Sequence, residues 1–239
     1  MAGSTLPKLT CALAATALVA AGGTSAQASA PSPGARLAYK ALSNALTSGA
    51  FHAVEVRKLG KAVTDATEDV ANAEGTQTLS GSGGWKARIL VVNHSAYLAG
   101  NAAGLRTYFG FPAAVARKVG ARWVSIPSSS PGYSQASYDA TIESTIASIT
   151  PSSGKLTETG PTKIGGTEAI GIRGTGPSLN RAGTPSSITL YVSTTGRPLP
   201  LRAVLTDTKG DSKTVVLSGF GEHLTVRAPH GAVAILSLT

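Results

Sequence analysis

The chain has 239 residues, enough for one large all-β or α+β domain, or two small ones, with a real core. Only 5% of the residues are aromatic and 14% charged, a mix that favours a sheet-rich extracytoplasmic protein over a charged cytosolic enzyme. The net charge is +9, yet no basic run exceeds two residues and no aromatic platform lies among the charges, which argues against nucleic acid as a partner.

A basic surface without nucleic-acid features has two other interpretations. It can meet anionic lipid headgroups of a membrane surface, or wall polymers, through long-range attraction. The alternative is that the charge serves solubility alone. Both interpretations stay open from the sequence.

The amino terminus has the pattern of a secretory signal peptide. Lys8 precedes the apolar run LTCALAATALVAAGG, and small residues follow in TSAQASA. The run is too short for a membrane span. Ala26-Gln27-Ala28 fits the A-x-A rule, so residues 1–28 are predicted to be removed by cleavage after Ala28. A cut after Ala30 would place Pro31 directly beyond the bond. We therefore expect an extracytoplasmic protein, secreted or associated with the cell wall.

Cys11 is the only cysteine of the chain. It lies near the beginning of the apolar run, whereas a lipidated cysteine would close such a run, so a lipid anchor at Cys11 is not expected. Cleavage leaves a mature chain with no thiol, no disulfide and no cysteine metal ligand. Its stability must come from packing.

The mature chain opens with a helix and continues with strands. PSPGARLAYKALSNALTSG begins with proline, ends with glycine and repeats apolar residues at helical spacing. Short segments separated by Gly, Asn and Asp follow, which predicts a meander of antiparallel strands. In WKARILVVN, Trp85, Ala87, Ile89 and Val91 share one face.

The middle of the chain is predicted to be helical. NAAGLRTYFGFPAAVARKVG reads as a helical passage capped by Asn101 and broken near Gly110 to Pro112. YSQASYDATIESTIASIT is predicted as one helix, with an apolar stripe running from Tyr138 to Ile149.

The remainder is predicted to be sheet. Hairpin turns are expected at Thr195-Gly196 and Lys209-Gly210-Asp211. In GRPLPLRAVLTD, alternation places Leu199, Leu201, Ala203 and Leu205 on one face. The total is about ten strands and three or four helices in a single domain, residues 29–239.

Catalytic signatures are weak. GDS at Gly210 to Ser212 is typical of a hairpin turn, and GYSQA around Ser134 lacks the second glycine of a nucleophile elbow. The four histidines are scattered, without a carboxylate at ligand spacing, and the acidic residues are too dispersed for a glycosidase pair. We predict no enzyme, no catalytic residue, no metal ligand and no cofactor.

Several motifs carry a family resemblance across residues 35 to 230. AYLAGNAAGLRTYFGFPAAVARKVGARWVSIP, GGTEAIGIRG, LYVSTTGRPLPLRAVL and LSGFGEHLTVRAP follow one another. This succession resembles the actinobacterial LppX and LprG lipoprotein family, which is related in fold to the lipoprotein carrier LolA. The resemblance implies an α+β fold with a curled antiparallel sheet, a half-open, unclosed β-barrel, whose helices cover the concave face. It also implies an apolar cavity that holds acyl chains.

One departure from that family concerns the membrane anchor. Its lipoproteins carry a lipidated cysteine directly after the apolar run, where this chain has Ser29 and Pro31. Free secretion or wall association is therefore favoured over anchoring.

The leading hypothesis is a secreted cell-envelope protein that binds or carries an acyl lipid or lipidated ligand in a hydrophobic cavity. The predicted lining comprises Ile89, Val91, Leu105, Phe109, Ile142, Ile146, Ile170, Ile172, Leu190, Val192, Leu199 and Leu201. Arg106, Arg117 and Lys118 are predicted to meet a headgroup at the rim. The alternatives are an envelope interaction or sensor module with no ligand cavity and, last, a hydrolase. A membrane-protein partner stays unidentified.

Overall fold

The computed structural model describes residues 31–72, 74–130, 132–138, 140–152, 155–179 and 183–235. The predicted signal peptide, its cleavage after Ala28 and the assessment of Cys11 lie outside the described residues. Residues from Pro31 onward form one compact unit. The strands are β1 (Ala50–Leu59), β2 (Ala62–Ala71), β3 (Gly75–Gly81), β4 (Trp85–Val92), β5 (Ser95–Gly100), β6 (Val124–Pro127), β7 (Thr157–Ile164), β8 (Thr167–Gly176), β9 (Ser186–Ser193), β10 (Pro200–Thr206), β11 (Ser212–Ser218) and β12 (Val233–Ala234).

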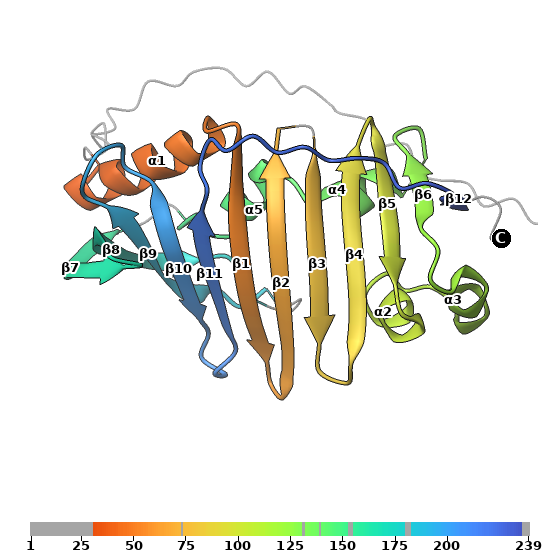
Figure 1. Ribbon diagram of the computed structural model, residues 1–239. Helices are drawn as coiled ribbons and strands as arrows, with labels where there is room; N and C mark the ends of the chain where they lie inside the picture. Colours follow the sequence, from red (N-terminus) through yellow and green to blue (C-terminus); the bar gives the residue numbers. More distant parts are fainter. Residues whose placement is uncertain are drawn as a thin grey trace, which may run out of the picture. The chain divides into compact units, whose positions relative to one another are not determined.

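These strands make one sheet in the order β12-β6-β5-β4-β3-β2-β1-β11-β10-β9-β8-β7 (Figure 1). All neighbours are antiparallel except β12 and β6. Pairing of β1 with β11 joins the two meanders in the middle of the sheet. The described strands β7 and β12 are the two edges and do not pair with each other, so the sheet is unclosed, as predicted.

The strand count differs from the expected ten. The described chain has twelve strands, and two of the shortest, β6 with four residues and β12 with two, lie at one edge.

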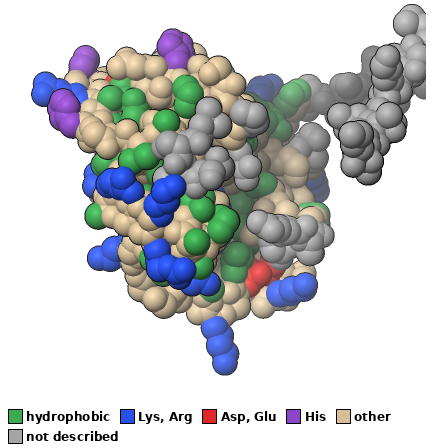
Figure 2. Space-filling view, turned by 90° about the vertical axis from the view of Figure 1, so that its right-hand side faces the viewer, with side chains coloured by type: hydrophobic (Ala, Val, Ile, Leu, Met, Phe, Trp, Pro, Cys, Tyr) green, Lys and Arg blue, Asp and Glu red, His purple; other side chains and the backbone are tan. Residues whose placement is uncertain are grey.

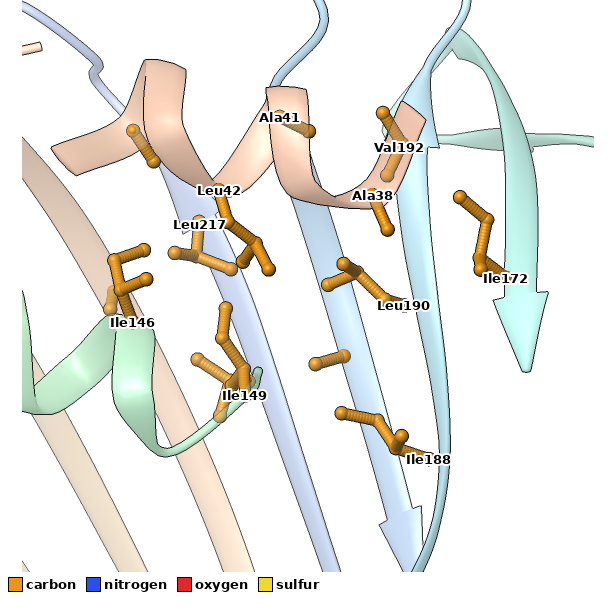
Figure 3. Close-up of a cluster of buried hydrophobic side chains, with 14 of the residues drawn as sticks. Ala38, Ala41, Leu42, Ile146, Ile149, Ile172, Ile188, Leu190, Val192 and Leu217 are labelled. Atoms are coloured by element: carbon orange, nitrogen blue, oxygen red, sulfur yellow. The ribbon is translucent and has the colours of Figure 1, made fainter. Parts of the chain in front are cut away.

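Helix α1 (Pro33–Leu46) confirms the first predicted helix. The hydroxyl of Ser32 accepts a hydrogen bond of 3.2 Å from the backbone N–H of Ala35 and caps its amino terminus. Its buried face consists mainly of alanine, which lets the helix lie close to β9 and β10. Figure 3 shows Ala38, Ala41 and Leu42 of this face above Leu190 of β9, with Val192 of the same strand beside the helix.

Helices α2 (Ala102–Thr107) and α3 (Ala113–Val119) confirm the predicted broken helical passage. Gly110 separates them at a φ of +70°, a conformation that favours glycine. The side chain of Asn101 caps α2 as expected, accepting a hydrogen bond of 2.8 Å from the N–H of Gly104.

The prediction of one continuous helix through residues 133–150 was wrong. Two helices, α4 (Tyr133–Tyr138) and α5 (Ile142–Ala147), occupy this stretch. Thr141 adopts an extended conformation, and its hydroxyl accepts a hydrogen bond from the N–H of Ser144, which starts a new helix. Tyr138 is consequently 56% exposed and leaves the stripe, while Ile142, Ile146 and Ile149 are buried.

Helices α1, α4 and α5 cover one face of the sheet, called here the inner face (Figure 1). The alternation predicted for β4 is confirmed, since Ala87, Ile89 and Val91 point inward and are buried. The opposite, outer face carries half-exposed valines such as Val54 and Val216, which are cross-strand neighbours. The inner face therefore holds the core.

Candidate functional site

A cavity of about 440 Å³ lies on the inner face between strands β1 to β4 and β11 and helix α5. The cavity lies nearest the end of the sheet at which the β1–β2, β3–β4 and β10–β11 hairpins turn. Its lining residues next to these turns are Leu59, Thr64, Trp85 and Lys213. The polar lining residues are Glu55, Arg57, Thr64, Glu68, Gln77, Ser144, Thr145, Ser148 and Lys213. The remaining ones are Leu59, Ala66, Leu79, Trp85, Tyr108, Tyr138, Ala147 and Pro177.

The location of this cavity follows from a change of character along β1. Inward-facing Phe51 and Ala53 are apolar and buried in the core that contains α1 and α5. The next inward positions are Glu55 and Arg57, which stand beside the cavity instead. Apolar side chains thus fill the space beneath the helices, whereas the charged side chains of the same strand border the cavity.

An ion-pair network forms the floor of the cavity. Glu55 bonds Lys213 Nζ through Oε2 at 2.7 Å and Arg57 through Oε1 at 3.0 Å. Lys213 also donates a hydrogen bond of 2.9 Å to the hydroxyl of Ser148 on the segment that ends α5. The side chain of Lys213 is only 5% exposed, so this ammonium is almost fully removed from water. A charge buried in this way needs the partners it has.

Glu68 lies beside this network in a different setting. Its carboxylate accepts hydrogen bonds from the amide of Gln77 at 2.7 Å and from the hydroxyl of Thr145 at 2.9 Å. Burial raises the pKa of Glu68, and nearby Glu55 adds to the rise, while the two hydrogen bonds and Lys213 oppose it. Among the described residues no cation pairs with it directly.

Aromatic rings form one wall of the cavity. Trp85 at the start of β4 stacks on Tyr108 at the end of α2, with ring centroids 5.9 Å apart and planes inclined by 21°. Phe109 meets Tyr108 edge-on at 5.1 Å. The cavity thus joins a charged floor to an aromatic wall.

Nine of the twelve predicted lining residues lie in or against packed clusters, and none of the twelve lines the 440 Å³ cavity. The cluster under α1 and α5 contains Ile142, Ile146, Ile172, Leu190 and Val192. The clusters near α2 to α4 contain Ile89, Val91 and Leu105, and Phe109 packs against them. The three partly buried strand or loop residues are Ile170, Leu199 and Leu201.

The face predicted for residues 199–205 is interrupted. The pairing of β10 with β9 shifts register between Pro200 and Arg202, so only Ala203 and Leu205 continue the buried face. Leu199 and Leu201 are partly buried.

The predicted rim residues lie on two short helices. Arg106 belongs to the last turn of α2, and Arg117 and Lys118 to the last turn of α3. All three are exposed. None of the three lines the 440 Å³ cavity.

The structure also places the groups weighed for catalysis. Asp211 of the GDS sequence accepts a hydrogen bond of 2.7 Å from the N–H of Gly60, as a turn residue does. Sequence spacing did not show that His52 pairs with Asp69, at 2.7 Å across β1 and β2. Within the described part of the chain, no three His, Cys, Asp or Glu gather as a metal site would require.

Sequence reasoning missed the charged floor of the cavity. A signal was present, because Glu55 and Arg57 continue the period-two face of Phe51 and Ala53 in FHAVEVRKL. Charges at inward positions of a central strand indicate a polar interior. Their partners come from β11 and α5, which are distant in sequence.

Solved structures share this architecture. LprF from Mycobacterium bovis is 18% identical, with a TM-score of 0.53 over 84% of this chain and 99% of its own. The Mycobacterium tuberculosis lipoprotein LppX is 15% identical, with a TM-score of 0.51 over 82% of this chain and 100% of its own. The fold is that of these mycobacterial lipoproteins. The resemblance read from the sequence is confirmed at the level of the fold.

Two further comparisons gave nothing. No family model and no curated protein matches the sequence. Among the described residues, no helix combines the length and apolar character needed to span a membrane.

Proposed function

We propose that this protein binds one lipid molecule in the inner-face cavity and works in the cell envelope as a lipid-binding or lipid-carrier protein. The observation that carries the proposal is the cavity itself. Its volume of about 440 Å³ exceeds the roughly 300 Å³ at which ligand pockets begin. The fold shared with two lipoproteins supports the same assignment.

The aromatic and aliphatic part of the lining suits a hydrocarbon chain. Leu79, Trp85 and Tyr108 lie along it, and burial of each methylene group contributes about 0.8 kcal/mol. The twelve predicted lining residues extend this proposal to larger ligands. Most of them fill the adjoining core, so longer or multiple acyl chains would enter by separating α5 from the strands beneath it.

The proposed ligand reaches the protein from a membrane, and the charge distribution supports this partner. Between Gly75 and Tyr138 the sequence holds six Lys and Arg and no Asp or Glu, so this stretch contributes +6 of the net +9. It spans β3 to β6 and α2 to α4. Figure 2 views the molecule from that side and shows Lys and Arg spread over the face. Such a face is attracted to anionic headgroups.

The interaction or sensor module remains a second hypothesis. A core completely filled by side chains would favour it, and the cavity favours lipid binding instead. The arrangement of the described serine, histidine and carboxylate groups does not support a catalytic role. The function proposed for this protein is therefore a binding function.

Native mass spectrometry of the mature protein, residue 29 onward, tests the proposed function. The protein is purified from an actinobacterial host without detergent and is also incubated with host lipid extract. We expect added mass that extracts into organic solvent and fragments as an acyl lipid. A bare mass in both preparations would reject lipid binding and favour the protein-binding module.

A further inference from the structure

The floor of the cavity brings two cations face to face. Arg57 of β1 and Lys213 of β11 are direct cross-strand partners, and both line the cavity. Like charges placed opposite one another destabilise a sheet unless an anion lies between them. Here Glu55 supplies that anion, with one carboxylate oxygen for each cation.

The charges on this floor do not balance. Glu55 is shared by both cations and is the sole carboxylate paired with either one among the described residues. The next carboxylate, Glu68, bonds Gln77 and Thr145 instead. Burial also raises the pKa of Glu68, which makes its charged form less favourable than that of an exposed carboxyl group.

Polar atoms of this floor are also left without partners. Arg57 Nε and Gln77 Oε1 are buried and make no hydrogen bond to the described residues. Gln77 is only 5% exposed, and both residues line the cavity. Within the described part of the chain, Lys213 Nζ has two partners for the three hydrogens of an ammonium group. Buried polar groups rarely stay unpaired, so a ligand that fits here must bring acceptor oxygens for Arg57 and Lys213 and a donor hydrogen for Gln77 Oε1.

We propose that this floor is an anion site that takes the carboxylate or phosphate headgroup of a single-chain lipid. The inference rests on the proposed function and adds the orientation of the ligand. The headgroup binds between Arg57 and Lys213, and the chain runs out along Leu79 and the Trp85–Tyr108 wall. A protonated oxygen of the headgroup, or a hydroxyl beside it, can donate to Gln77 Oε1.

Matched ligands test the proposal on the mature protein. Dodecanoate, dodecyl phosphate, dodecan-1-ol and inorganic phosphate are titrated separately by calorimetry. Hydrogen bonds to charged groups contribute about 1.5–3 kcal/mol, so we expect the two anionic lipids to bind roughly ten- to a hundredfold more tightly than dodecan-1-ol. Inorganic phosphate should bind far more weakly than dodecyl phosphate, because it lacks the chain.

Variants assign the preference to the floor. Arg57→Gln should reduce the preference for dodecanoate over dodecan-1-ol to less than about threefold, because the variant lacks one of the two cations of the floor. Lys58→Gln, the matched control, removes a neighbouring charge from the outer face of the same strand and should keep the full preference. Lys213→Met is a second test, read only if its circular dichroism spectrum matches that of the unmodified protein. Arg57 is 39% exposed and is the safer substitution for folding.

The outcomes separate the headgroup site from lipid binding itself. Equal affinities for dodecanoate and dodecan-1-ol would overturn the headgroup site and leave the proposed function standing. Binding of inorganic phosphate as tight as that of dodecyl phosphate would identify a free anion as the ligand and overturn the lipid source. Failure of all three twelve-carbon compounds, together with a bare native mass, would reject the proposed function and this inference together.

Discussion

The side-chain amide of Gln77 donates a hydrogen bond of 2.7 Å to Oε1 of Glu68, and each residue is only 5% exposed. The two residues are cross-strand partners on β2 and β3. The hydrogen bonds donated to Glu68 stabilise its carboxylate form, whereas burial removes the group from water. Burial is the largest cause acting on its pKa and raises it above its ordinary 4.5.

Glu68→Gln should change how stability depends on pH. Because the pKa of Glu68 is higher in the folded chain than in the unfolded one, the native state binds more protons between those two values. The contribution of Glu68 is therefore most favourable below pH 4.5 and is lost as pH rises through its folded pKa. The variant should thus gain stability relative to the unmodified protein as pH rises, measured by urea unfolding at several pH values between 4.5 and 8.

The control for this experiment is Glu168→Gln. Glu168 is an exposed residue of β8 paired with Lys163 at 2.9 Å. Its substitution removes a surface carboxylate and gives the reference profile with which that of Glu68→Gln is compared. A Glu68→Gln profile that runs parallel to that of the unmodified protein would contradict the raised pKa.

Leu190→Ala should destabilise the protein strongly. Leu190 is fully buried on β9 beneath α1, and Figure 3 shows it among Ala38, Val192 and Ile188. Removing its methyl groups loses transfer free energy and leaves a void, at a cost of about 2–5 kcal/mol. Val56→Ala, at a 44% exposed position on the outer face, should cost under about 1 kcal/mol. Denaturant titration compares the two, and equal losses would argue against this core.

Gly104→Ala should destabilise α2 although alanine is the better helix former. A Cβ at Gly104 would overlap the backbone carbonyl oxygen of Lys86 on β4, and a backbone atom cannot move away cheaply. We expect a loss of about 1–3 kcal/mol, as for overpacked sites. Gly160→Ala in β7 has nothing within 4 Å of the new Cβ and serves as the control. A thermal melt of Gly104→Ala as stable as this control would mean that α2 does not contact β4 so closely.

Removing three charges from α2 and α3 should weaken attachment to anionic vesicles. Each Lys or Arg near a membrane surface contributes about 1 kcal/mol, so Arg106→Gln, Arg117→Gln and Lys118→Gln together should lower the partition coefficient roughly a hundredfold. Cosedimentation with phosphatidylglycerol vesicles at low and high salt measures this.

The matched control changes the same number of charges elsewhere. Lys155→Gln, Arg173→Gln and Lys209→Gln replace exposed residues outside the basic stretch. Vesicle binding reduced equally by both triple variants would show that net charge, rather than this face, attracts the membrane.

Local patterns determined much of the fold. Period-two alternation placed Ala87, Ile89 and Val91 on the buried face of β4, and the cap at Asn101 and the break at Gly110 marked α2 and α3. These features depend on neighbouring residues alone, so the sequence contains them. The break at Thr141 escaped prediction because Tyr138 stands four residues before Ile142, so the apolar stripe runs across Thr141 at helical spacing.

The sequence by itself therefore determined a sheet-rich α+β chain, its hairpins, its first helix and the positions that point inward. Only the tertiary structure decided which inward positions meet packed core and which border a cavity. Glu55 and Lys213 are 158 residues apart, yet pairing of β1 with β11 brings them to 2.7 Å. Alternation specifies the face on which a side chain lies, but the neighbour it meets there depends on strand order and on where the helices end, which are set by long-range packing.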